Sequence, residues 1–227
     1  MTEEVMFQTQ DKVLIFGNWV EPPGAIGAAL LLHMMPADKS SWDDLQRELE
    51  KRRIASLAID LRGHGQSTSK GSEAIDYKEF TDTEHQDSLY DIESSLQFLR
   101  KNGFGLEKVA IIGASIGANL ALQTAASNRS IPAIVLLSPG ENYRGIETFP
   151  IAKNLNPNQA ILASGSSGDD QASFDAAEKI IELAPSREKR FIPLTSAGHG
   201  TNMFAQQKQF PEGIASWVED QLEKKEV

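Results

Sequence analysis

The chain has 227 residues, of which 40% are hydrophobic, and its net charge is −10. This length and hydrophobic content suit one large α/β domain, and the acidic charge disfavours nucleic acid and anionic membranes as partners. The absence of cysteine excludes disulfides, thiolate metal sites and a cysteine nucleophile.

The chain begins with a pattern typical of a β-hairpin, followed by alternating strands and helices. Residues 5–8 and 13–16 predict an antiparallel pair. Buried strands are expected at 28–33 and 54–60, with a helix between them over 41–53. The polar stretch that follows the second of these strands predicts an exposed loop.

The middle of the chain predicts a long helix and then a strand–turn–helix unit. Leu89, Ile92, Leu96 and Leu99 share one face of a helix over residues 83–101. A short apolar strand at 108–112 follows, and the helix after it continues to about residue 128.

The last part continues the alternation. Strands are expected at 131–137, 160–163 and 190–194, with helices over 174–184 and 214–222. Repeated strand–helix units predict a mostly parallel sheet of about eight strands with helices on both faces. The economical interpretation is one domain spanning residues 1–227.

The most informative motif is Gly113-Ala114-Ser115-Ile116-Gly117, a G-x-S-x-G between a strand pattern and a helix pattern. A serine on such a turn has a strained backbone and presents its hydroxyl at the carboxyl end of the strand. The first amides of the following helix can stabilise an oxyanion. Taken alone the motif is weak, because a tight turn with a solvated serine uses the same residue types.

Two further segments supply partners for this serine, each at the carboxyl end of a predicted strand. Gly198-His199-Gly200 offers a base on a flexible loop, and Asp169 or Asp170 offers a carboxylate to orient it. Ligands of parallel sheets bind beyond these strand ends. The order Ser, Asp, His, each at a different strand end, is far more specific than any one of them.

With these segments the chain resembles the α/β-hydrolase family, over nearly its whole length. Residues 60–67 are similar to the family's D-x-R-G-x-G-x-S loop, residues 113–117 to its nucleophile elbow, and residues 31–35 to its strand-end His-Gly segment. The resemblance implies Ser115 as nucleophile, His199 as base and then acid, and Asp169 as the orienting carboxylate. Asp170 is the alternative acid, because the preference rests only on the short turn after the strand.

The resemblance also implies an oxyanion hole built from the amide of Ile116 and one amide after His33. The family usually has glycine after this histidine, whereas this chain has Met34 and then Met35. Met35 is the expected donor and Met34 the alternative.

The segment between the strands at 133–137 and 160–163 leaves no room for a large cap domain. We therefore expect an open cleft and small ester substrates, as in the small, cap-poor esterases and dienelactone hydrolase-like members of the family. The cysteine nucleophile of dienelactone hydrolase itself is missing. Pocket walls are expected from five residues: Met34, Met35, Tyr143, Phe149 and Met203.

The expected activity is that of a carboxylesterase, with a thioesterase or peptidase on the same triad as one alternative. A non-catalytic ligand-binding homologue is the other. No cofactor or metal is expected, since the histidines lack the spacing of a metal pair. His33 and His64 are expected to hold loops, and His85 to face solvent.

Nothing in the sequence indicates a location outside the cytoplasm. No apolar run is long enough for a membrane span, and the acidic N-terminus lacks the basic and apolar regions of a signal peptide. We therefore expect a cytoplasmic protein that acts on a small molecule. The sequence does not set its oligomeric state.

Overall fold

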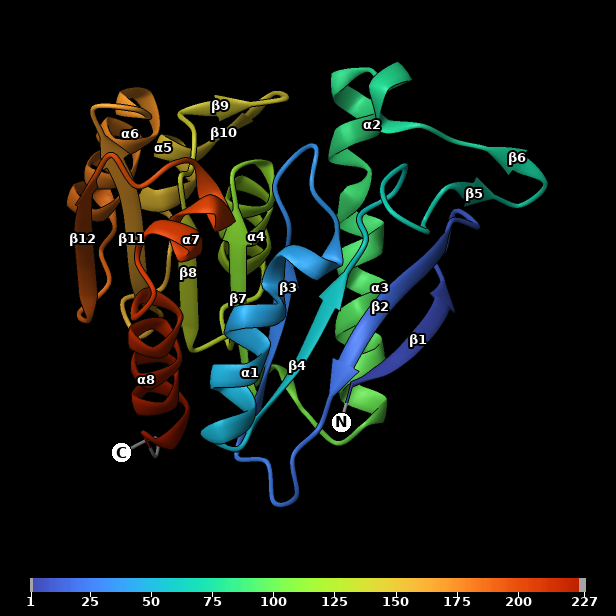
Figure 1. Cartoon of the computed structure of the whole chain (residues 1–227), viewed down its shortest axis with the longest axis horizontal. Helices are drawn as coiled ribbons and strands as arrows, with labels where there is room; N and C mark the ends of the chain where they lie inside the picture. Colours follow the sequence, from blue (N-terminus) through green and yellow to red (C-terminus); the bar gives the residue numbers. More distant parts are fainter. Residues whose placement is uncertain (1, 225–227) are drawn as a thin grey trace.

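The computed structural model describes residues 2–224 and contains an eight-stranded sheet in the order β1-β2-β4-β3-β7-β8-β11-β12 (Figure 1). β2 pairs antiparallel with β1 and β4, and all other neighbours pair in parallel. The predicted fold class and N-terminal hairpin are therefore confirmed. The strands are β1 Glu3–Gln8, β2 Leu14–Val20, β3 Gly27–Leu32, β4 Ile54–Ile59, β7 Val109–Ala114, β8 Ala133–Leu137, β11 Ala160–Ser167 and β12 Lys189–Thr195.

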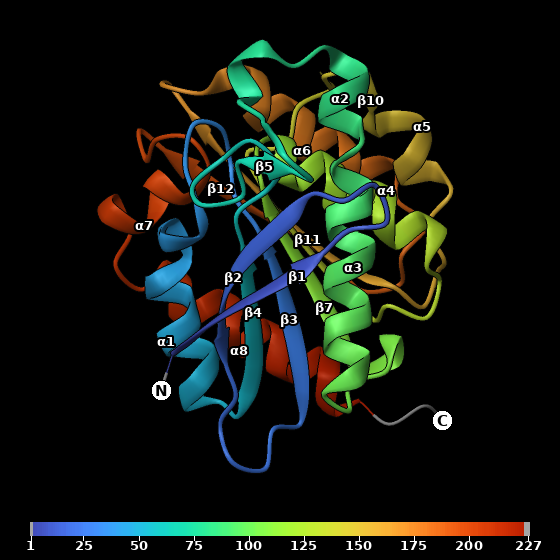
Figure 2. The same cartoon turned by 90° about the vertical axis from the view of Figure 1, so that its right-hand side faces the viewer.

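Helices cover both faces of this sheet, and Figure 2 shows α1 and α3 on opposite sides of β3 and β4. β3, β4, β7 and β8 are buried along their whole length, so each contributes side chains to two cores. One core packs under α1 and α8, and the other under α3, α4 and α6. The main helices are α1 Asp43–Lys51, α3 Ser88–Lys101, α4 Ile116–Ser127, α6 Gln171–Leu183 and α8 Phe210–Glu223.

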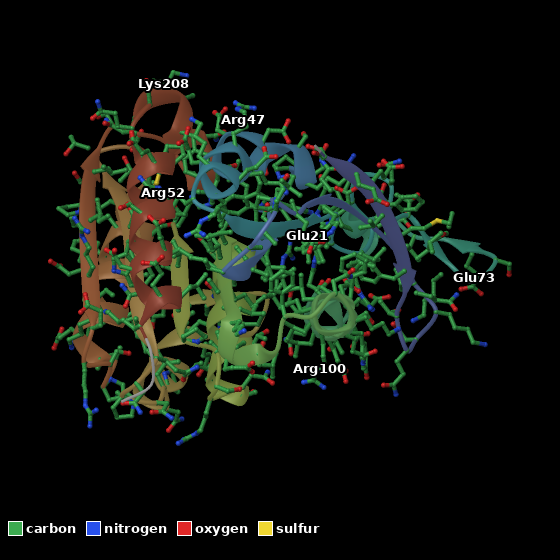
Figure 3. All side chains as sticks on the ribbon, turned by 90° about the horizontal axis from the view of Figure 1, so that it is seen from below. Glu21, Arg47, Arg52, Glu73, Arg100 and Lys208 are labelled. Atoms are coloured by element: carbon green, nitrogen blue, oxygen red, sulfur yellow. The ribbon has the colours of Figure 1, made fainter. Side chains whose placement is uncertain are left out.

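An ion pair ties the two helices of the first face together. Arg52, which ends α1, bonds Glu219 of α8 at 2.7 Å, and Figure 3 shows Arg52 from below between these helices. The contact lies at the end of the sheet opposite the strand ends that carry Ser115 and His199 (Figure 1).

Two connections differ in detail from the sequence-based expectations, and a third holds the short insertion between β8 and β11. The helix expected over residues 83–101 is interrupted at Asp87 into α2 (Asp82–Gln86) and α3. The stretch after β4 contains a small ribbon, β5 (Ser69–Lys70) with β6 (Glu73–Ala74), and a 3₁₀ helix, η2 (Tyr77–Glu79). Between β8 and β11 lie β9 (Asn142–Tyr143), β10 (Ile146–Glu147) and α5 (Thr148–Lys153).

The prediction that His85 faces solvent is wrong. His85 on α2 is only 4% exposed, and its ring packs edge-on against Phe80 at 5.4 Å. The chain before α2 folds back over the histidine, which a helical pattern alone does not reveal. Among residues 2–224, no helix is long and apolar enough to span a bilayer.

Candidate active site

Ser115 occupies the turn between β7 and α4 with φ 54° and ψ −121°. Such a conformation is costly for a residue with a side chain and persists only where its surroundings enforce it. Here the Ser115 amide donates a hydrogen bond to the Leu137 carbonyl at the end of β8. The side chain is half-buried at the carboxyl edge of the sheet.

The two glycines of the motif are required by close packing. A Cβ at Gly113 would lie 2.0 Å from the Gly117 carbonyl oxygen. One at Gly117 would lie 2.2 Å from the carbonyl oxygen of Leu32 and 2.7 Å from that of His33. The elbow thus sits directly against the backbone of the segment that follows β3, where the oxyanion-hole amide was expected.

Residues 197–200 form the loop that carries His199, here called the histidine loop. Each of these residues is held by one hydrogen bond from the ends of β8 and β11. The bonds are Ala197 N to Ser166 Oγ (2.7 Å), Gly198 N to Asp169 Oδ2 (2.8 Å), His199 Nδ1 to Asp170 Oδ2 (2.7 Å) and Gly200 N to Ser138 Oγ (2.9 Å).

The imidazole is therefore paired with Asp170, and this corrects the expectation that Asp169 orients it. Asp169 lies at the turn before α6, where its carboxylate accepts from Ser166 Oγ and from the Gly198 amide. Asp170 is one residue closer to α6 and turns its carboxylate to the ring. Asp169 thus holds the backbone of the histidine loop, and Asp170 holds the imidazole.

The environment of Asp170 favours its ionised form. Burial raises the pKa of this carboxyl, but hydrogen bonds from His199, Ser138 and Ser173 outweigh burial and hold the pKa below its usual range. An ionised Asp170 makes Nδ1 of His199 the donor, which leaves Nε2 free to take a proton. The His199 side chain is 32% exposed, so part of the ring is open to solvent.

Packing brings the histidine loop against the elbow. A Cβ at Gly200 would lie 3.3 Å from Cβ of Ala114, the residue before Ser115, and 2.7 Å from the Met34 sulfur. The loop therefore touches both the nucleophile turn and the segment after β3. Ser115, His199 and Met34, which are far apart in the chain, are gathered at one edge of the sheet.

The amides expected in the oxyanion hole are unoccupied by protein acceptors. Within residues 2–224, the amides of Ile116, Met34 and Met35 donate to no protein acceptor. Both methionine amides thus remain candidates. His33 stabilises this segment, because its ring accepts from the Leu61 amide (3.0 Å) and donates to the Met34 carbonyl (2.8 Å).

The residues expected to line a pocket fall into separate places. Met203 is fully buried in the core beside Ser164 and presents no surface to a ligand, which corrects that expectation. Met34 is 8% exposed and also packs in this core, whereas Met35 is half-buried. Position close to His199 in the sequence did not reveal that the Met203 side chain points inward.

Tyr143 and Phe149 line a cavity of about 730 Å³ between β9, α5 and α6. Its other walls come from residues 140–142 and from one face of α6. Ser115, Asp170 and His199 are not among the lining residues. The Tyr143 hydroxyl bonds Ser173 Oγ at 3.1 Å, and Ser173 helps to lower the pKa of Asp170.

Two serines that hold the histidine loop were not identified in the sequence analysis. Ser138 and Ser166 both hold the histidine loop. The available signal was their place at the carboxyl ends of two buried strands, next to the strands that carry Ser115 and His199. Serine is too common at such ends for this signal to single them out.

The loop at residues 60–67, here called the arginine loop, is held by buried charges. Lys39 bonds Asp60 at 2.6 Å, and Arg62 bonds both Asp91 (2.8 Å) and Asp11 (2.9 Å).

No group of three or more His, Asp or Glu side chains suited to a metal ion occurs within residues 2–224.

A family model described as the alpha/beta hydrolase fold matches residues 29–163, more than half of the chain. The chain belongs to this family. The matched span contains Ser115 and the arginine loop, while Asp170 and His199 lie beyond it. No curated protein matches the sequence.

Solved structures share the fold at low sequence identity. The chain is similar to the esterase Pf2001 of Pyrococcus furiosus, with a TM-score of 0.79 and 15% identity over 98% of this chain and 93% of that one. It is similar to an esterase domain from a Rhodothermus marinus protein (0.75, 15%, 98% and 100%). It is also similar to DcsB, solved with its substrate analogue (0.80, 13%, 99% and 100%).

Proposed function

We propose that this hydrolase-fold protein is a serine hydrolase that cleaves small carboxylic esters with Ser115, His199 and Asp170. The observation that carries the proposal is the 2.7 Å hydrogen bond from His199 to Asp170, on a loop packed against the residue before Ser115. The strained φ of Ser115 gives further support, since strain of this kind is typical of functional sites.

In the proposed reaction, Ser115 Oγ attacks the ester carbonyl while Nε2 of His199 takes the hydroxyl proton. The amides of Ile116 and of Met35 or Met34 stabilise the oxyanion. His199 then gives its proton to the leaving alcohol, and an acyl-enzyme forms. Water, deprotonated by His199, attacks the acyl group, and the acid leaves as Ser115 regains its proton.

The preference for small esters rests on the short insertion between β8 and β11. Only β9, β10 and α5 lie there, so the proposal includes a single domain without a large cap and an open cleft. A cytoplasmic location remains part of the proposal.

A fluorophosphonate probe with peptide mapping tests the nucleophile. The wild-type protein should be labelled on the peptide that contains Ser115, and Ser115→Ala should not be labelled. Loss of both labelling and p-nitrophenyl acetate hydrolysis in Ser115→Ala is expected, at about 10³-fold or more. Labelling that persists in this variant would overturn the assignment of Ser115.

A substrate panel separates the activities that one triad can support. p-Nitrophenyl esters of increasing chain length are compared with acyl-CoA thioesters and aminoacyl amides, using Ser115→Ala as the blank. Highest turnover on short esters is expected. A preference for thioesters or amides would replace the proposed substrate class, and no turnover or labelling of wild type would favour a binding protein.

A further inference from the structure

Ser138 lies directly after β8 and holds the loop that carries the base of the proposed acid–base pair. Its side chain is fully buried, and its Oγ accepts from the Gly200 amide at 2.9 Å. The same hydroxyl is near Asp170 and helps to hold the pKa of that carboxyl below its usual range. A lone pair of this hydroxyl thus holds the histidine loop, and its proton remains available to the neighbouring carboxylate.

The backbone around Ser138 is fixed to the other parts of the site. Its own amide donates to the Ser164 carbonyl in β11, and the carbonyl of the preceding Leu137 accepts from the Ser115 amide. Ser138 therefore stands where β7, β8 and β11 meet, between the nucleophile turn and the acid. A displacement of its hydroxyl would therefore change the positions of both Asp170 and the histidine loop.

Ser138 also has a backbone conformation that serine rarely adopts, with φ 48°. Glycine would take this conformation without strain, so the backbone alone does not call for serine. A buried hydroxyl that costs strain must be held by its partners. Both partners here belong to the candidate active site.

We propose that Ser138 is a positioning residue, whose hydroxyl sets Asp170 and the histidine loop in the geometry that lets His199 act on Ser115. The inference rests on the proposed function for its catalytic consequence, but the placement of the His199–Asp170 pair can be measured without turnover. Ser138 touches no substrate in this role and acts only through the acid and the base.

The test compares Ser138→Ala and Ser138→Gly with the matched control Ser196→Ala. Alanine removes the hydroxyl and keeps the strain, whereas glycine removes both. Ser196 also follows a strand and has φ 49°, but its hydroxyl bonds nothing within the described residues. Agreement between the alanine and glycine variants, despite different stabilities, identifies the hydroxyl as the cause.

The first readout is the second-order rate of fluorophosphonate labelling of Ser115, together with kcat and KM on p-nitrophenyl acetate. Both Ser138 variants should label and turn over about tenfold more slowly, with KM within about twofold, because a lost buried partner of this kind costs roughly one factor of ten. Ser196→Ala should match wild type.

The second readout is the low-field proton resonance of His199 Nδ1, identified by its absence in His199→Gln. It should be lost or broadened in both Ser138 variants and kept in Ser196→Ala. Wild-type resonance and labelling in Ser138→Gly would overturn the positioning role, even if Ser115→Ala abolishes labelling. If wild type fails to label, the proposed function fails, and an altered resonance would still support the positioning role.

Discussion

The arginine loop and the histidine loop each carry a side chain that is paired with an aspartate from another segment, yet the two pairs differ in exposure. The side chains of Arg62 in the arginine loop and of its partner Asp91 in α3 are 4% and 0% exposed, and their charges neutralise each other. In the histidine loop, His199 is 32% exposed and Asp170 15%. A buried charge that is fully paired has no free site for proton transfer, whereas a half-exposed imidazole paired at one nitrogen has the other available for chemistry.

The largest difference is expected between Asp169 and Asp170, the two aspartates that bond the histidine loop. Asp170→Asn should lower ester turnover about 10³- to 10⁴-fold, because the amide cannot hold the imidazole in the required tautomer. Asp169→Asn should cost about tenfold or less, because it weakens the bonds from Ser166 Oγ and the Gly198 amide and leaves the imidazole paired with Asp170. Measurements of ester turnover and thermal unfolding for both variants test this difference. The opposite order would restore Asp169 as the acid.

Removing a charge partner of the arginine loop should lower the stability of the protein and leave ester turnover nearly unchanged. Asp91→Ala leaves Arg62 buried with Asp11 as its remaining close partner, and should lower the free energy of unfolding by about 3 kcal/mol. Turnover by the protein that remains folded should stay within a few-fold of wild type.

The matched control for this variant is Asp87→Ala. Asp87 is 37% exposed and lies 3.9 Å from the same arginine. It should change the free energy of unfolding by about 0.5 kcal/mol or less. Urea unfolding measures both variants, and equal losses would show that burial does not set the strength of these pairs.

A smaller effect concerns His33, which lies between the two loops. Burial, aided by the nearby His64, lowers the pKa of His33 to about 4 from 6.5. The unfolded chain therefore takes up a proton as pH falls below about 6.5 while the folded protein does not. Stability that is present at neutral pH is thus lost toward pH 4, by about 2 kcal/mol between pH 7 and pH 5 from this group alone.

His33→Gln removes this titration while offering an acceptor to the Leu61 amide. Urea unfolding at pH 7 and pH 5 should show a pH-dependent loss that is smaller in the variant by about 2 kcal/mol. An equal loss in both proteins would mean that His33 is protonated in the folded state.

The sequence predicted the sheet well because its strands are buried. The run at 109–112 is apolar on both faces, as expected for a central parallel strand that is buried on both. The choice between Asp169 and Asp170 could not be made in the same way. The two residues are adjacent and chemically identical, and only the turn before α6 decides which carboxylate faces the ring.

Burial of single side chains was likewise beyond the sequence. Met203 follows the histidine by four positions and suits a pocket wall, but α7 (Met203–Gln206) turns it into the core. His85 looks like a polar helix residue until the fold of the preceding segment covers it. Both depend on contacts between distant segments, which a local pattern does not contain.

The loop that carries His199 follows β12. This strand is at the edge of the sheet and pairs only with β11. Edge strands open more readily than central ones, because fewer contacts must be broken. Fraying of β12 would release the histidine loop while the central strands of both cores stay packed. Esterase activity is therefore expected to vanish at lower denaturant concentration than the fluorescence of the buried Trp42 and Trp217, and to return last on refolding.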